Sequence, residues 1–133
     1  MRRVSKNKIA NVQLVQFDGE TALAQIFGGA SIDAIFTLFP DPWPKRRHQK
    51  NRIWNTDFFR LCQHLLKQGG QLYLATDDGP YLAQALETLA DINTFTPTNP
   101  WLIQTHYARK WKSKGRTLHY RSFQKGIFNL SQY

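Results

Sequence analysis

A single cysteine, Cys62, is all that the 133-residue chain contains, so no disulfide can form within it. Cys62 lies in the apolar stretch FFRLCQHLL, where we expect a small core residue, and a lone free thiol is typical of a reducing cytoplasm. The chain also lacks any uncharged apolar run of about 18 residues. Its basic start, MRRVSKNK, is not followed by an apolar segment of signal-peptide length. Neither membrane insertion nor secretion is therefore predicted, and we expect a cytoplasmic protein.

Acidic residues are scarce, because 9 Asp and Glu stand against 18 Lys and Arg and leave a net charge of +9. All the basic residues except Arg60 and Lys67 fall into three clusters, which are interleaved with tryptophan and tyrosine. The clusters are Arg2, Arg3, Lys6 and Lys8; Lys45, Arg46, Arg47, Lys50 and Arg52; and Arg109, Lys110, Lys112, Lys114, Arg116, Arg121 and Lys125. One such cluster alone is typical of a solvated surface. Three of them favour a polyanionic partner, for which nucleic acid is the natural candidate.

Apolar residues, by contrast, make up 41% of the chain, with 14% aromatic, which argues against a disordered protein. The length suits one modest domain with a real core, so we treat residues 1–133 as a single domain.

The hydrophobic pattern predicts strands that alternate with helices. The predicted strands are Asn11–Phe17, Ile32–Phe39 and Gln71–Thr76. Helices are predicted after each strand or basic loop: one at 19–29 that ends in Gly28 and Gly29, one that begins at Asn55 or Thr56 and ends at Gly69 and Gly70, and one with Pro80 at its start.

Aspartates follow the three predicted strands: Asp18, Asp41 and Asp77. If the strands are parallel, their carboxyl ends share one edge of the sheet, where open α/β folds bind ligands. Aspartate is also common in turns, which is the simpler explanation for any one of the three. Because three occur in phase, we predict that they line a common cleft. Pro40 and Pro42 would restrict the backbone around Asp41.

The string FPDPWPKRRHQKNR, followed by a helix and then GGQLYLATDDGPYLAQALETL, resembles the bacterial tRNA (guanine(46)-N(7))-methyltransferase family from about Val4 to about Tyr120. The resemblance implies a Rossmann-like, S-adenosylmethionine-dependent methyltransferase fold that methylates guanine N7 in tRNA. Carried over by position, Asp41 resembles the family's central acid, which touches both the cofactor and the chemistry. Asp18 resembles an acid that contacts the cofactor. The positions that resemble tRNA-contacting or activity-supporting residues are Lys45, Arg47, His48, Asp77 and Lys110.

Individual side chains of the basic loop have two possible roles. We expect Trp43 to anchor the loop by packing rather than to stack on a base, and His48 either to contact RNA or to be solvated.

Two departures from the family pattern stand out. In RKWKSKG, Arg109 replaces the family's Thr and Lys112 replaces its Glu, so recognition of the target nucleotide by this segment is in question. The chain also resembles only the part of the fold after the first two strands, without the E-x-G-x-G turn and the acid that holds the cofactor ribose. Gly28 and Gly29 cannot replace that turn, because they end a helix and precede a strand.

We therefore expect an incomplete methyltransferase domain that is inactive as an isolated chain. The loss of two strands would leave the Asn11–Phe17 segment to pair with Ile32–Phe39, to pack loosely, or to wait for another chain, with self-association or pairing with the missing half as consequences. The alternative is a non-catalytic RNA-binding remnant of the same family.

Overall fold

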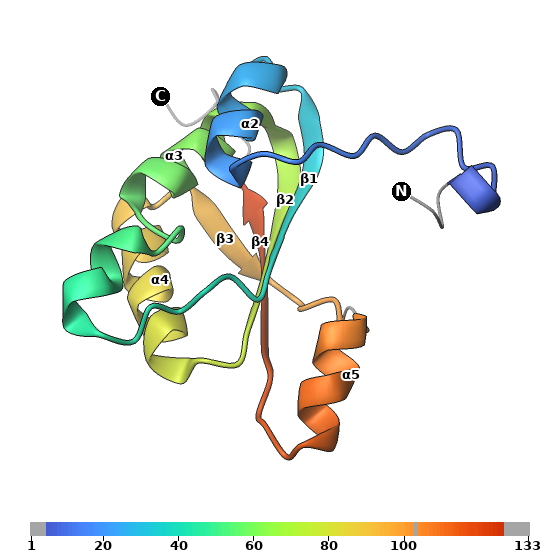
Figure 1. Ribbon diagram of the computed structural model, residues 1–133. Helices are drawn as coiled ribbons and strands as arrows, with labels where there is room; N and C mark the ends of the chain where they lie inside the picture. Colours follow the sequence, from blue (N-terminus) through green and yellow to red (C-terminus); the bar gives the residue numbers. More distant parts are fainter. Residues whose placement is uncertain (1–4, 103, 127–133) are drawn as a thin grey trace.

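The computed structural model describes residues 5–102 and 104–126, which form a four-stranded sheet with helices (Figure 1). The elements, in chain order, are α2 (Gly19–Ile26), β1 (Ile32–Leu38), a 3-10 helix η1 (Arg46–Asn51), α3 (Thr56–Leu65), β2 (Leu66–Thr76), α4 (Gly79–Ile92), β3 (Phe95–Thr98), α5 (His106–Ser113) and β4 (His119–Lys125). The strand order is β1-β2-β4-β3. β1 and β2 are parallel, whereas β4 is antiparallel to both β2 and β3.

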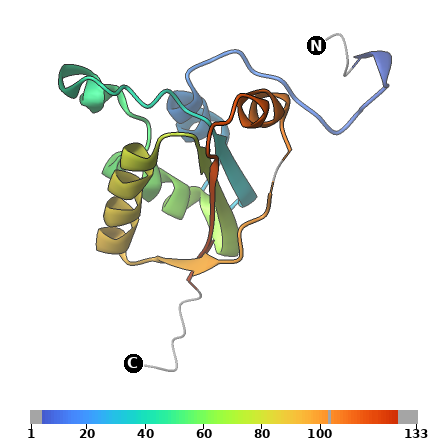
Figure 2. The same ribbon diagram turned by 90° about the horizontal axis from the view of Figure 1, so that it is seen from below.

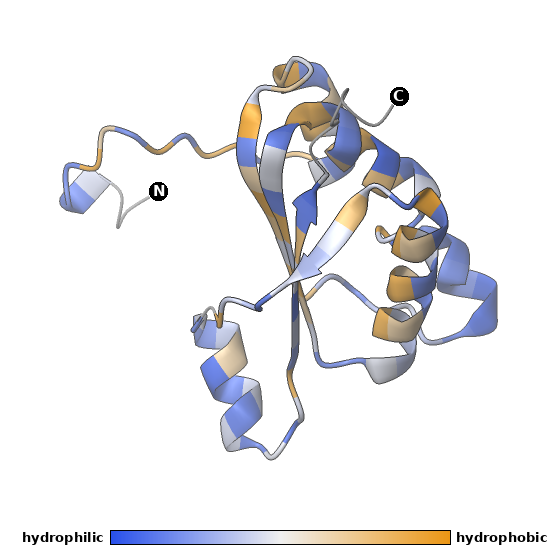
Figure 3. Cartoon of the chain, turned by 180° about the vertical axis from the view of Figure 1, so that it is seen from behind, coloured by the Kyte–Doolittle hydropathy of each residue, from blue (hydrophilic) through white to orange (hydrophobic). Residues whose placement is uncertain are grey.

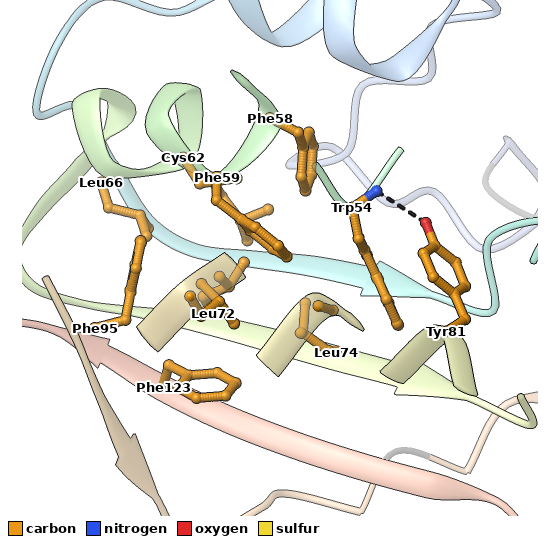
Figure 4. Close-up of a cluster of buried hydrophobic side chains, with 13 residues drawn as sticks. Trp54, Phe58, Phe59, Cys62, Leu66, Leu72, Leu74, Tyr81, Phe95 and Phe123 are labelled. Atoms are coloured by element: carbon orange, nitrogen blue, oxygen red, sulfur yellow. Dashed lines mark hydrogen bonds between the residues drawn. The ribbon is translucent and has the colours of Figure 1, made fainter. Parts of the chain in front are cut away.

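The hydrophobic core lies between the sheet and helices α3 and α4, which cover the same face (Figures 1 and 2). In the close-up, aromatic residues of the α3 region and Tyr81 of α4 pack against Leu72 and Leu74 of β2 and Phe123 of β4 (Figure 4). Trp54 is completely buried, and it connects two layers because its backbone N–H donates to the Tyr81 hydroxyl (2.8 Å) while its indole N–H donates to Thr37 Oγ1 of β1 (2.9 Å).

Cys62 is a core residue, as predicted, and it is fully buried on α3. Burial in these apolar surroundings raises the pKa of the Cys62 thiol to about 12, since the thiolate would have to give up its hydration. Burial therefore disfavours the reactive thiolate form of Cys62 in the folded protein.

The central part of the sequence pattern is confirmed. β1 and β2 are adjacent and parallel, with Leu38 opposite Ala75, so Asp41 and Asp77 both follow the carboxyl ends of neighbouring strands. Asn55 caps α3 by accepting from the Phe58 N–H (2.9 Å), and Pro80 occupies the first turn of α4. These features were predicted because each depends on local capping chemistry and on a continuous apolar strand.

Two predictions about element boundaries are wrong. Asn11–Phe17 is not a strand, and its apolar side chains Val12, Leu14, Val15 and Phe17 are exposed. An alternating pattern becomes a strand only when it pairs with a neighbour, and this segment does not pair with the free edge of β1. α3 also ends before the two glycines, at Leu65, and β2 begins at once at Leu66. Gly69 adopts a left-handed φ of 75° at an irregularity in the β1–β2 pairing.

The elements after residue 94 were not predicted. β3 is only four residues long and contains Pro97, and β4, HYRSFQK, contains few strand-favouring apolar residues. α5 is hydrophilic over most of its length (Figure 3). Such short polar segments gain their structure from their neighbours and carry weak local signals.

β1 forms one edge of the sheet, and α2 lies beside it over an open apolar groove of about 760 Å³. The groove is lined mainly by apolar side chains of residues 15–38, together with Ile53 and Phe58. Within the described residues, no helix combines the length and the apolar composition needed to cross a membrane.

The buried hydrogen bond between Trp54 and Tyr81 makes a testable contribution to stability. We expect Tyr81→Phe to lower the free energy of unfolding by about 1–3 kcal/mol, because it leaves the buried Trp54 N–H without an acceptor. Urea unfolding followed by circular dichroism measures this. Tyr107→Phe, at a side chain 40% exposed, is the matched control and should change stability by less than about 0.5 kcal/mol. Equal effects of the two substitutions would contradict the assignment.

Candidate nucleic-acid interface and active site

The candidate site lies at the carboxyl edge, which we define as the ends of β1 and β2 together with the start of β4. Phe39 extends the pairing beyond β1, because its N–H donates to the Ala75 carbonyl (2.7 Å). β4 begins at the same edge, since His119 pairs with Thr76. Residues 39–55, residues 77–78 and the turn after α5 therefore meet here.

The segment that carries Asp41 has an unusual backbone. Phe39 and Trp43 both adopt left-handed conformations, with φ values of 52° and 43°, on either side of Pro40 and Pro42. Such conformations are uncommon for bulky residues and persist only where the surroundings enforce them. Asp41 is exposed between them, and its Oδ1 accepts from the Trp43 N–H (3.2 Å).

Arg52 holds the backbone around Asp41 in this left-handed conformation. Only 7% of Arg52 is exposed, its Nε donates to the Pro42 carbonyl (2.7 Å), and a second N–H donates to the Gln84 side chain of α4. Its guanidinium also lies 4.9 Å from the centre of the Tyr81 ring. As a member of the second basic cluster, Arg52 was expected to face a polyanionic partner, but the structure corrects this: its charge is turned inward and holds the loop onto α4.

The other basic residues of the loop face solvent, where an anionic partner could contact them. Lys45, Arg46, Arg47 and Lys50 are exposed on and around η1. His48 is half-buried, with its ring 5.6 Å from that of Trp43 in an edge-on contact. Trp43 therefore packs within the loop, as expected, and His48 is its partner.

Asp77 is placed differently from Asp41. Its side chain is 12% exposed and forms an ion pair with Arg116, which comes from the turn between α5 and β4. The next residue, Asp78, caps α4 by accepting from the Tyr81 N–H (2.8 Å). The two successive aspartates thus divide their roles, because one begins the helix and the other faces the edge.

α5 stands beside this edge and is held to it by aromatic contacts. The Phe39 ring lies 4.8 Å from Tyr107 and 6.4 Å from Tyr120. Three cations surround the face of Trp111, with Lys110, Lys114 and Arg116 at 5.6, 5.0 and 3.9 Å from the ring centre. Arg109 and Lys112, which depart from the family pattern, line a neighbouring cavity of about 350 Å³ with Gln104, Arg116 and Tyr120.

Asp18 lies at the start of α2, and its described contacts are local. Its carboxylate accepts from the Thr21 N–H (2.9 Å) and the Thr21 hydroxyl (2.8 Å), which lowers the pKa of Asp18. This is a helix N-cap, the simpler alternative weighed for an aspartate at such a position. The structure brings Asp41 and Asp77 to one edge, and a cofactor contact by Asp18 stays a prediction.

Comparison with known proteins identifies the family. Residues 1–120 match a protein-family model described as "Putative methyltransferase". The chain belongs to this methyltransferase family. Relatives named tRNA (guanine-N(7)-)-methyltransferase include one from Thermus thermophilus, 37% identical over 94% of this chain and 42% of the relative, and one from Chlamydia felis, 33% identical over 90% and 56%. The chain spans about half the length of these curated relatives.

Solved structures support the fold. An rRNA methylase from Streptococcus thermophilus superimposes with a TM-score of 0.59 at 18% identity, over 95% of this chain and 64% of that one. A protein from Thermus thermophilus described as "Putative DNA Modification Methylase", complexed with S-adenosyl-L-methionine, gives a TM-score of 0.52 at 18% identity over 82% of this chain and 51% of that one. The predicted Rossmann-like methyltransferase fold is confirmed, and S-adenosylmethionine is supported as the cofactor of the family.

The described residues do not by themselves form an S-adenosylmethionine site. The groove beside β1 is lined mainly by apolar side chains, and neither Asp18 nor Asp41 is among them. Gly28 and Gly29 connect α2 to the start of β1, which is the end opposite Asp41. No glycine-rich turn therefore meets the carboxyl edge within the described residues.

Sequence reasoning missed two residues that shape the site. Arg116 was assigned to a basic cluster with no individual role, and no signal in the sequence pairs it with Asp77 across 39 positions. Arg52 had a weak signal, since it directly precedes the apolar pair Ile53 and Trp54.

Because Arg52 is turned inward, its substitution should affect stability more than substitution of the exposed basic residues of the loop. Arg52→Ala should lower the free energy of unfolding by about 2–3 kcal/mol, because it removes two hydrogen bonds and a cation–π contact from a buried position. The exposed Arg47→Ala is the control of equal charge and should stay within about 0.5 kcal/mol of the wild type. Thermal and urea denaturation provide the comparison, and a stable Arg52→Ala variant would show that the loop is held by other contacts.

Proposed function

We propose that this chain is part of a tRNA (guanine-N7)-methyltransferase that transfers a methyl group from S-adenosylmethionine to N7 of guanine 46 in tRNA. The observation that carries the proposal is Asp41, held in a constrained backbone at the carboxyl edge. Asp77 follows the adjacent strand, and exposed cations lie on both flanks. The names of the curated relatives support the same activity.

The chemistry of guanine N7 suits two carboxylates better than a general base. N7 carries a lone pair and no proton, so its methylation requires positioning rather than proton removal. The base gains positive charge as the new bond forms, and nearby carboxylates favour that charge. Carboxylates also accept from guanine N1–H and N2–H₂, which fixes the orientation of the base. We assign these roles to Asp41 and Asp77.

The tRNA backbone would contact the exposed cations. Lys45 and Arg47 of the loop and Lys110 of α5 flank the edge, where phosphate contacts would position the RNA without reading its sequence. His48 would act indirectly, by holding Trp43. We expect this binding to take place in the cytoplasm.

We further propose that methyl transfer needs the first strands of the fold in addition to the described residues. The open edge of β1 and the apolar groove beside it are where such strands would pair. Residues 1–133 alone would then bind the cofactor more weakly than about 1 mM and show no turnover. The second candidate, a non-catalytic RNA-binding remnant, is favoured by Arg109 and Lys112, which make the α5 face more basic than the family pattern.

The activity is tested with the chain fused to the first strands of a close relative. Labelled methyl from S-adenosylmethionine should appear in tRNA at N7-methylguanine, and Asp41→Ala should lower the rate at least about 100-fold because it removes a group that acts on the reacting base. Asp91→Ala, at an exposed acid near the end of α4, is the control and should retain activity. A folded fusion that binds tRNA without methylating it would favour the remnant, and turnover by the unfused chain would refute the need for the added strands.

RNA binding has its own signature in salt dependence. The affinity for tRNA should fall with salt with a log–log slope of about −0.7 to −0.9 for each phosphate neutralised. Arg47→Ala combined with Lys50→Ala should make that slope shallower by about one to two units. The control of equal charge is Arg60→Ala with Lys67→Ala, outside the three clusters, which should leave the slope unchanged. Filter binding measures the affinity for tRNA between about 50 and about 200 mM salt. An affinity that does not change with salt would exclude phosphate contacts as the main source of binding free energy.

A further inference from the structure

Arg116 occupies an unusual position between an aromatic face and an acid. Its guanidinium carbon lies 3.9 Å from the centre of the Trp111 ring, and its Nη1 pairs with Asp77 Oδ2. The Arg116 side chain is 51% exposed, whereas that of Asp77 is 12% exposed. The arginine therefore covers the acid from the solvent side.

The backbone after α5 delivers the side chain to this place. Gly115 has a φ of 79°, a left-handed conformation that glycine adopts without steric cost, and its N–H donates to the Lys112 carbonyl (3.0 Å). The Arg116 N–H then donates back to the Trp111 carbonyl (3.1 Å). The chain thus turns back on the end of α5 and lays Arg116 over the indole.

The same two surfaces suit a guanine base. Arg116 offers planar N–H donors to a carboxylate and a flat, delocalised face to Trp111. Guanine offers N1–H and N2–H₂ along one edge, built on the same nitrogen–carbon–nitrogen unit, and a flat face that stacks on tryptophan. Adenine lacks this pair of donors, because its N1 is an acceptor.

The Trp111 indole N–H is buried and has no hydrogen-bond partner within the described residues. It lies in the plane of the ring, so a base stacked on the ring face would not accept from it. Its NMR signal would nevertheless report a change of the group that stacks on Trp111.

We infer that Arg116 is a resident placeholder for the target guanine: it occupies the site between Trp111 and Asp77 and must leave for the base to enter. The inference rests on the proposed function, since it assigns to Asp77 the recognition of the N1–H and N2–H₂ groups of the target guanine. It makes Arg116 a positioning residue, which keeps the carboxylate of Asp77 paired and oriented until a base with matching donors replaces it.

The competing role for Arg116 is that of a phosphate contact. Its present partners argue against this, because its charge is already paired with Asp77 and its face is stacked on Trp111, while Lys112 and Lys114 are exposed beside it. The two roles predict opposite effects of removing the side chain.

The experiment measures binding of GMP and AMP to the 133-residue chain by the NMR signal of the Trp111 indole N–H, assigned with Trp111→Phe. The two nucleotides carry the same phosphate and differ only in the base. Arg116→Ala should bind GMP roughly tenfold more tightly than the wild type, because no ion pair and no cation–π contact must be broken first. AMP can stack on Trp111 but cannot donate to Asp77 in the same way, so it should bind more weakly than GMP to both proteins. Lys114→Ala, which removes a cation over the same ring, is the control and should not tighten GMP binding.

Asp77→Asn in the Arg116→Ala background should abolish the preference for GMP. The placeholder role is wrong if Arg116→Ala does not increase the affinity for GMP more than Lys114→Ala does, or if it increases the affinities for GMP and AMP equally. It is also wrong if neither the wild type nor Arg116→Ala binds GMP. A fusion that fails to methylate tRNA while the GMP preference persists would instead overturn the proposed function and leave the placeholder in place.

Discussion

The arrangement of the site depends on one buried cation. Arg52 gives hydrogen bonds to the Pro42 carbonyl and to Gln84, and it lies on the Tyr81 ring, so it ties the loop that carries Asp41 to α4. The parallel pair of β1 and β2 fixes where that loop begins, and Arg52 fixes where it goes next. A charge is normally expensive to bury, and here hydrogen bonds and an aromatic face compensate for the lost water. The exposed cations of the loop can then serve an anionic partner.

The fold could be predicted wherever the signal was local. β1 reads as a continuous apolar run, Asn55 and Pro80 mark helix starts, and the phase of Asp41 and Asp77 follows from parallel strands. The failure at Asn11–Phe17 has a different cause, because a strand is defined by its neighbour and not by its own pattern. β4 was not predicted for the converse reason. Its pairing with β2 and β3 makes it a strand, although its polar sequence carries no strand signal.

The positions of Asp41, Asp77 and the exposed basic loop were predictable, but the N-cap contacts of Asp18 and the connections within the site were not. The pairing of Arg116 with Asp77 joins the end of β2 to the turn before β4, and the inward turn of Arg52 depends on the position of α4. Both are products of tertiary packing, in which an arginine within a basic run is indistinguishable by sequence from its solvent-facing neighbours. Charge clusters therefore indicated the kind of partner, while the individual roles of the charges depend on the folded arrangement.

The left-handed backbone at Phe39 and Trp43 has a consequence for how this segment can evolve. Each such residue holds about 1–3 kcal/mol of conformational energy that the surrounding contacts must offset. Glycine at either position would relax the backbone, yet it would also remove the ring of Phe39 from Tyr107 and Tyr120 or that of Trp43 from His48. Relieving the backbone strain would thus also loosen the loop, and a looser loop would give Asp41 a wider range of positions. Substitutions that ease the backbone would therefore be selected against wherever a single position of that carboxylate matters more than the stability of the fold.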